Sequence, residues 1–111
     1  MRKRRPPVYM EQGFKEALEN GGILEIECLS PVTQKSSEIV GEWWIYVRET
    51  FSGEVVRTAL CATRHTHPRL IKTSRGVVML ATKLGATVVC VPVVEGKIGV
   101  CEVEFPDGPG S

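Results

Sequence analysis

The sequence predicts a single α+β domain in which two helices pack on a five-stranded antiparallel or mixed sheet. Three observations lead to this prediction: alternating apolar and polar residues in 23–29 and 42–50, a helical period after Thr73, and short connections between predicted strands. A length of 111 residues suits one domain, and 42% hydrophobic with 24% charged residues is typical of globular proteins. The predicted order is helix, three strands, helix, two strands.

Residues 1–9 are predicted to form a flexible basic arm before the domain. Pro6 and Pro7 favour an extended backbone and keep the preceding cations out of a helix. A short helix is expected from residue 10 to residue 19, and the Asn20-Gly21-Gly22 sequence should end it, because glycine adopts the left-handed conformation of a helix stop.

Three strands follow the first helix. ILEIECL (23–29) alternates apolar residues with glutamates, which is typical of a sheet with one face in water. SPVTQKSSEIVG (30–41) is expected to be a polar connection. EWWIYVRET (42–50) is the clearest strand, and after a turn at 51–53 the chain returns through 54–63. These segments predict an antiparallel meander.

The strand over 42–50 has two different faces. Trp43, Ile45 and Val47 share one of them, and the opposite face holds Trp44, Tyr46 and Arg48. If the second face is open to solvent, it offers a stacking platform for unpaired bases or an interface for a protein. The alternative is that each helix covers one face of the sheet, which would make both aromatic rings of that second face part of the core.

The second helix is predicted to start after Thr73, a suitable N-cap, and to stop at Gly85. Its apolar residues recur with helical spacing at Val77, Leu80, Ala81 and Leu84. Two strands, 87–94 and 97–105, are then expected to form a hairpin around Glu95-Gly96. This hairpin would place Cys90 opposite Cys101, as two small apolar residues packed side by side. The domain should therefore span 10–105, with a loose tail at 106–111.

The basic N-terminus is not followed by an apolar stretch, and no run approaches the roughly 18 apolar residues of a membrane span. We therefore expect a cytoplasmic protein with no membrane partner, in which the four cysteines are reduced.

The charges are unevenly distributed, although the net charge is only +1. Residues 55–94 contain six Lys and Arg residues and no Asp or Glu, whereas residues 6–54 are rich in Glu. Such segregation indicates an anionic partner or a self-complementary dimer. If the segments interleave in the fold, the basic run is instead an ordinary solvated surface.

The stretch CATRHTHPRLIKTSR (61–75) is the strongest functional signal. Cations and histidines surround the start of the second helix, where unpaired backbone N–H groups and two hydroxyls could also contact phosphate. The basic arm is the natural accessory for binding a nucleic-acid backbone. The candidate anion-binding residues are Arg2, Lys3, Arg4, Arg5, Arg64, His65, His67, Arg69, Lys72, Thr73, Ser74 and Arg75.

Two chemical alternatives use the same stretch. Cys61, His65 and His67 are separated by even numbers, so on an extended chain they would share one side and could bind zinc. A Cys–His pair could also act as a nucleophile, but Cys61 stands between Leu60 and Ala62, and apolar surroundings make a thiol less reactive. Neither alternative is framed by a recognised motif.

The sequence thus predicts a small, non-enzymatic binding or regulatory protein without a cofactor. Its most favoured partner is nucleic acid or another polyanion. The alternative is a protein-interaction or homodimer module that uses the Trp/Tyr-rich strand and edge strands. A metal-binding or Cys/His enzyme is a third interpretation.

Overall fold

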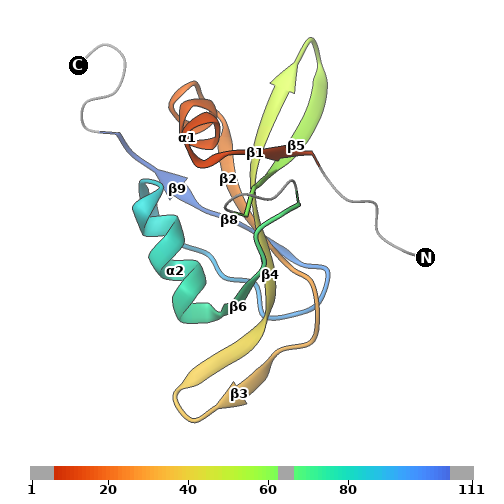
Figure 1. The fold of residues 1–111 in the computed structure, drawn as a ribbon, viewed down its shortest axis with the longest axis vertical. Coiled ribbons are helices and arrows are strands. Elements are labelled where there is room, and N and C mark those ends of the chain that lie inside the picture. The colour runs from red at the N-terminus through yellow and green to blue at the C-terminus, as the bar shows by residue number, and fades with distance from the viewer. Residues whose placement is uncertain (1–6, 63–66, 106–111) are drawn as a thin grey trace.

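The computed structural model describes residues 7–62 and 67–105, which form two helices and several short strands around one hydrophobic core (Figure 1). In chain order the elements are β1 (Val8–Tyr9), α1 (Glu11–Glu19), β2 (Ile23–Cys28), β3 (Thr33–Lys35), β4 (Glu38–Phe51), β5 (Glu54–Leu60), β6 (Ile71–Thr73), α2 (Ser74–Lys83), β7 (Ala86–Val88), β8 (Ile98–Val100) and β9 (Glu102–Val103).

The main sheet is built around β4, which runs along the length of the molecule (Figure 1). Its strand order is β1-β5-β4-β2-β8, and β3 and β6 also pair with the first half of β4. The sheet is mixed, because β1 is parallel to β5 while the other pairs are antiparallel. β7 and β9 form a separate two-stranded sheet.

The register of β4 with its neighbours separates two faces. Ile45 pairs with Ile26, and Tyr46 pairs with Glu25. Because successive side chains of a strand point to opposite sides, the first pair belongs to an inner face and the second to an outer face. The outer face, as the term is used below, consists of Ile23, Glu25, Glu27, Trp44, Tyr46, Arg48, Arg57, Ile98 and Val100.

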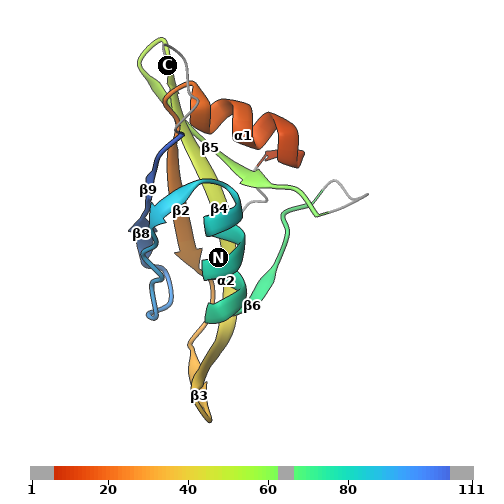
Figure 2. The ribbon, with the colours of Figure 1, turned by 90° about the vertical axis from the view of Figure 1, so that its left-hand side faces the viewer.

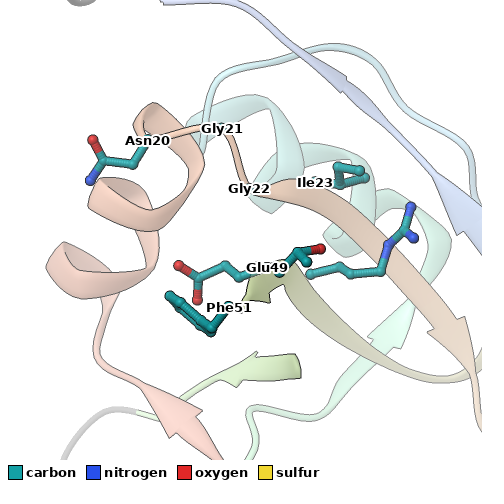
Figure 3. A pocket seen from close by; sticks show the side chains of 8 residues that line it. Asn20, Gly21, Gly22, Ile23, Glu49 and Phe51 are labelled. Carbon is teal, nitrogen blue, oxygen red and sulfur yellow. The ribbon is translucent and has the colours of Figure 1, made fainter. Parts of the chain in front are cut away.

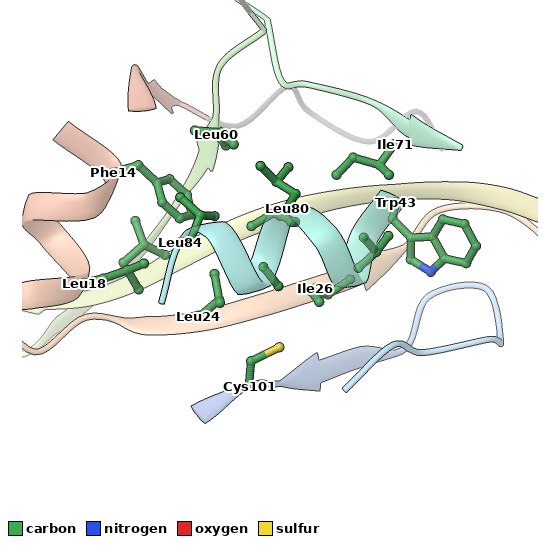
Figure 4. Close-up of a cluster of buried hydrophobic side chains, with 14 of the residues drawn as sticks. Phe14, Leu18, Leu24, Ile26, Trp43, Leu60, Ile71, Leu80, Leu84 and Cys101 are labelled. Carbon is green, nitrogen blue, oxygen red and sulfur yellow. The ribbon is translucent and has the colours of Figure 1, made fainter. Parts of the chain in front are cut away.

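Both helices pack on the inner face (Figures 2 and 4). Phe14 and Leu18 of α1 join Val77 and Leu80 of α2 in the same buried cluster as the inner-face side chains of β2 and β4. The interpretation in which each helix covers a different face is therefore wrong. Neither α1 nor α2 shields the outer face.

The helix ends follow the chemistry of the sequence. Gly21, with φ of 99°, takes the left-handed conformation after α1, and Gly85, with φ of 106°, does so after α2. The backbone N–H of Gly76 donates to Thr73 Oγ1 over 3.0 Å, which confirms Thr73 as the N-cap of α2.

The prediction of five strands in the order helix–βββ–helix–ββ is only partly correct, because three short strands were not anticipated. β1 lies inside the predicted basic arm, β3 lies inside the predicted 30–41 connection, and β6 immediately precedes α2. Each has two or three residues, too few to show a period, and each exists because a distant strand offers backbone partners. β4 also begins four residues earlier than the predicted 42.

The predicted hairpin of 87–94 with 97–105 is also wrong. Its turn does form, since Lys97 N–H donates to the carbonyl of Val94 over 3.0 Å. However, β7 pairs with β9, β8 pairs with β2, and residues 89–97 belong to no strand. Pro92 lacks an N–H for a ladder, and its carbonyl instead accepts a hydrogen bond of 2.8 Å from Trp43 Nε1.

Cys90 and Cys101 are nevertheless neighbours, as the hairpin alignment predicted. The backbone N–H of Cys90 lies 3.4 Å from Cys101 Sγ. Cys90 is exposed and Cys101 is buried, and the four cysteines are free thiols. Burial raises the pKa of the Cys101 thiol, so this sulfur stays protonated at neutral pH.

Within the described ranges, neither helix has the length and apolar character that crossing a membrane would require.

Candidate nucleic-acid interface

The connection between β5 and β6 folds back on the end of β5. Cys61 and Pro68 form an isolated antiparallel bridge, and Arg69 N–H donates to the Leu60 carbonyl over 2.8 Å. Ala62 N–H donates to the carbonyl of His67 over 3.1 Å. These backbone contacts fix the exposed side chains of His67 and Arg69 beside the end of β5.

Three of the predicted anion-binding cations are exposed: Arg69, Lys72 and Arg75. Across residues 7–62 and 67–105, no carboxylate forms an ion pair with any of them. Six peptide units separate the first from the last, so their Cα atoms lie within about 20 Å of each other. Neighbouring cations in this segment are three residues apart, so their Cα atoms lie within about 10 Å, roughly one Debye length at physiological salt, and each charge acts on a region that overlaps that of its neighbour.

The start of α2 is less favourable for an anion than the sequence suggested. Ser74 and Arg75 line a hollow of about 240 Å³ together with Glu38 from β4. The negative charge of the Glu38 carboxylate offsets the partial positive charge of the helix end and would repel an anion there. Thr73 Oγ1 already accepts the Gly76 N–H. The cationic side chains are thus a better anion-binding feature than the helix end itself.

Several predicted site residues lie outside the described ranges. These are Arg2, Lys3, Arg4, Arg5, Arg64 and His65. Their roles remain predictions, and so does the zinc site of Cys61, His65 and His67, because it includes one of them. The described residues by themselves contain no group of three His, Cys, Asp or Glu side chains arranged to hold a metal ion.

The outer face carries the two aromatic rings that the sequence offered as a stacking platform. Tyr46 is only 4% exposed, and its hydroxyl donates to Glu27 Oε1 over 2.7 Å. Trp44 is half-buried and meets Tyr46 edge-on, with ring centroids 6.3 Å apart and planes at 81°. Burial raises the pKa of Tyr46 to about 12, although the Arg57 charge opposes this shift. Only Trp44 therefore presents ring surface for stacking.

Next to these rings, one buried carboxylate holds two arginines. Arg57 Nε donates to Glu25 Oε1 over 2.8 Å, and Arg48 Nε lies 2.9 Å from Glu25 Oε2. The contact of Arg48 is ionic and is not a directed hydrogen bond, since its buried Nε has no acceptor in hydrogen-bond geometry among the described residues. The side chain of Glu25 is 3% exposed, whereas those of Arg48 and Arg57 are 32% and 43% exposed.

Arg57 was missed by the sequence-based site prediction, although a signal for it exists. The signal is the Ser52-Gly53 pair between two predicted strands, which indicates a two-residue hairpin turn. The structure has this turn: both residues have positive φ, and Phe51 pairs with Glu54. Counting back from that turn brings Arg48 opposite Arg57, as the structure has it.

A hollow of about 380 Å³ lies where α1 ends against the last residues of β4 (Figure 3). Glu49 and Phe51 project toward it in Figure 3. Of its lining residues only Arg48 and Glu49 carry charge, and both are engaged elsewhere. Arg48 contacts Glu25, and Glu49 accepts a 2.9 Å hydrogen bond from the Tyr9 hydroxyl, which raises the pKa of Tyr9. This hollow offers no free pair of groups for acid–base chemistry.

No family model, curated protein or solved structure matches the chain.

Proposed function

We propose that this protein binds nucleic acid, with the cations of residues 69–75 contacting the phosphate backbone and the outer face receiving unpaired bases. The observation that carries the proposal is that Arg69, Lys72 and Arg75 are exposed and have no ion pair with a described carboxylate. A cation that no carboxylate neutralises remains available to phosphate, and each such contact adds affinity that falls with salt.

The position of β6 links these cations to the outer face. Ile71 is buried in the core and pairs with Trp43. Because side chains alternate along a strand, Lys72 lies on the opposite side of β6, the side of the sheet that Trp44 also occupies. A strand of nucleic acid crossing from β6 to β4 would meet a cation first and an aromatic ring next, the combination typical of single-strand binding surfaces.

The test is a titration with labelled single- and double-stranded oligonucleotides of about twelve nucleotides, at about 50 mM and 200 mM salt. We expect single-strand binding that weakens steeply with salt. The double variant Arg69→Ala, Lys72→Ala should weaken binding about tenfold and, because two contacts are lost, flatten the dependence of log affinity on log salt by about 1.4 units.

A matched control removes two cations from another place. Lys15 and Lys83 both pair with Glu11, at 3.9 Å and 3.4 Å. The variant Lys15→Ala, Lys83→Ala has the same net charge as the test variant and should bind nearly as the wild type does. The proposal is wrong if the wild type binds no oligonucleotide even at low salt, or if this control loses as much affinity as the test variant.

A second candidate function is self-association through β8, the edge strand of the main sheet next to β2. Its two outward side chains, Ile98 and Val100, are 40% and 51% exposed, and an edge strand with exposed apolar residues can pair with another chain. Sedimentation over a range of concentrations should then show a dimer that Val100→Lys abolishes. Met79→Lys adds the same charge to an exposed position on α2 and should leave the dimer intact. A monomer at every concentration would exclude this candidate.

A further inference from the structure

Arg48 and Arg57 have an arrangement that ordinary surface arginines lack. They stand directly opposite each other on β4 and β5, on the outer face. Two like charges in such a cross-strand pair destabilise a sheet unless a counter-charge holds them. Glu25, on the strand at the other side of β4, supplies that counter-charge, with one carboxylate oxygen for each Nε.

The shared carboxylate fixes both guanidinium groups from below. Glu25 is almost fully buried, whereas both arginine side chains keep part of their surface in solvent. A guanidinium has five N–H donors, and Glu25 accepts a hydrogen bond from Nε of Arg57 while Nε of Arg48 makes an ionic contact with it. Within the described part of the chain, Glu25 is the only carboxylate that forms an ion pair with either arginine. Two positive charges thus share one negative charge.

Deepening the proposed function, on which this inference rests, we infer that Arg48 and Arg57 form a phosphate clamp: paired guanidiniums that bind one phosphodiester group of a single strand lying across the outer face. Glu25 acts as the positioning residue, since it touches the arginines and not the ligand. Arginine suits this role because its planar fork of donors matches two phosphate oxygens at once.

Trp44 lies on the same strand, four residues before Arg48. Its edge-on contact with the buried Tyr46 ring restrains its orientation. A base stacked on Trp44 and a backbone phosphate held by the arginine pair would therefore be bound about 13 Å apart along one strand. This separation suits a single strand, whose bases are free to leave a helical stack.

The net charge of the outer face cannot by itself attract a phosphate group. Glu27 lies two residues from Glu25 on β2, on the same face, so the positive and negative charges of the outer face nearly balance. Long-range attraction comes instead from the cations of residues 69–75. The clamp should consequently contribute affinity through the geometry of its donors, with less salt dependence than those cations provide.

The decisive variant is Glu25→Gln, because the two explanations predict opposite signs. If the outer face acts only through its charge, removal of a carboxylate strengthens binding of a labelled single strand. If Glu25 positions a clamp, binding weakens, by about fivefold or more, although the protein has become more positive. Binding is measured by fluorescence anisotropy, at a temperature at which circular dichroism shows every variant to be folded.

A second variant keeps the test valid if Glu25→Gln does not fold. Arg57→Lys preserves the charge at a half-exposed position but removes the planar fork, and should weaken binding by a similar factor. Lys15→Arg is its control, because it also keeps the charge but lies on α1, away from the proposed contacts, where Lys15 pairs with Glu11, and it should bind as the wild type does. If the wild type binds the single strand and Arg57→Lys binds it equally well, the clamp is overturned and the proposed function still stands. Absence of wild-type binding overturns both.

Discussion

Glu25 is a charged residue with 2% of its surface exposed, on a sheet face that neither α1 nor α2 covers. Burial of a carboxylate is strongly unfavourable unless the group is paired and hydrogen-bonded. Arg48 and Arg57 provide the pairing, and their side chains together with the neighbouring ring of Tyr46 exclude water from the carboxylate. The alternation of glutamates in β2 indicated a wet face, but what it produced is a nearly buried polar layer.

Tyr46 is part of the same layer and gives a pH-dependent prediction. Burial raises its pKa from 10.0 to about 12, so the fold favours the neutral phenol over the phenolate. Its contribution to the free energy of unfolding is complete below pH 10 and is lost as the pH rises toward 12. The loss amounts to at most about 2–3 kcal/mol. In the folded protein the tyrosinate absorbance step of Tyr46 should appear near pH 12 instead of near pH 10.

Tyr46→Phe should remove the absorbance step near pH 12 and leave only the titration of Tyr9. At neutral pH it should also destabilise the fold by about 1–3 kcal/mol, because Glu27 loses the hydroxyl that donates to it. Tyr9→Phe is the control, and should leave the high step in place. Titration of Tyr46 near pH 10 in folded protein would contradict the assigned burial.

At the scale of elements, β8 depends on a close approach between two backbone segments. A Cβ at Gly99 would lie 2.4 Å from the Cys90 carbonyl oxygen, so only glycine fits where Cys90 approaches β8. Gly99→Ala should therefore lower the free energy of unfolding by about 1–3 kcal/mol, since backbone cannot move as easily as a side chain tip. Chemical denaturation followed by Trp fluorescence measures the change.

Gly13→Ala is the matched comparison. Gly13 lies inside α1, and a Cβ there would lie 3.6 Å from the Tyr9 ring, an ordinary contact. Alanine at this position should stabilise the protein by about 0.5–1 kcal/mol, because glycine weakens helix interiors. If both substitutions destabilise by the same amount, the close approach of Cys90 to β8 is not what makes Gly99 necessary.

The two helices and β2 were located correctly from the sequence, whereas β4 begins four residues before its predicted start and most of 87–94 forms no strand. α1, α2 and β2 begin and end within about one residue of their predicted bounds, because an apolar stripe and flanking Asn, Gly or Thr signals mark them locally. β3, β6 and β1 could not be found in this way. Their two or three residues are strands because β4 and β5 present unpaired backbone groups there.

For the whole molecule, the decisive fact is that both helices share the inner face (Figure 2). Helices placed on opposite faces would have buried Trp44 and the arginine pair. Their placement on one face leaves a 44 × 32 × 28 Å molecule with a polar, partly aromatic sheet surface. The periodicity of the sequence shows that a helix has an apolar side, but it does not show which face of the sheet that side will pack against.

The sequence by itself determined the α+β class, the two helices with their ends, the alternation of β2 and β4, and the acid-free run that contains Arg69, Lys72 and Arg75. These features depend on residues close together in the chain, where spacing and local hydrogen bonding decide. Only the tertiary structure decided that Glu25 lies beneath Arg48 and Arg57, that Tyr46 is buried beside Trp44, and that Cys90 rests against Gly99. The contacts of Glu25 join three separate strands, and the burial of Tyr46 and the approach of Cys90 to Gly99 depend on how distant segments pack, which is decided by burial over the whole chain.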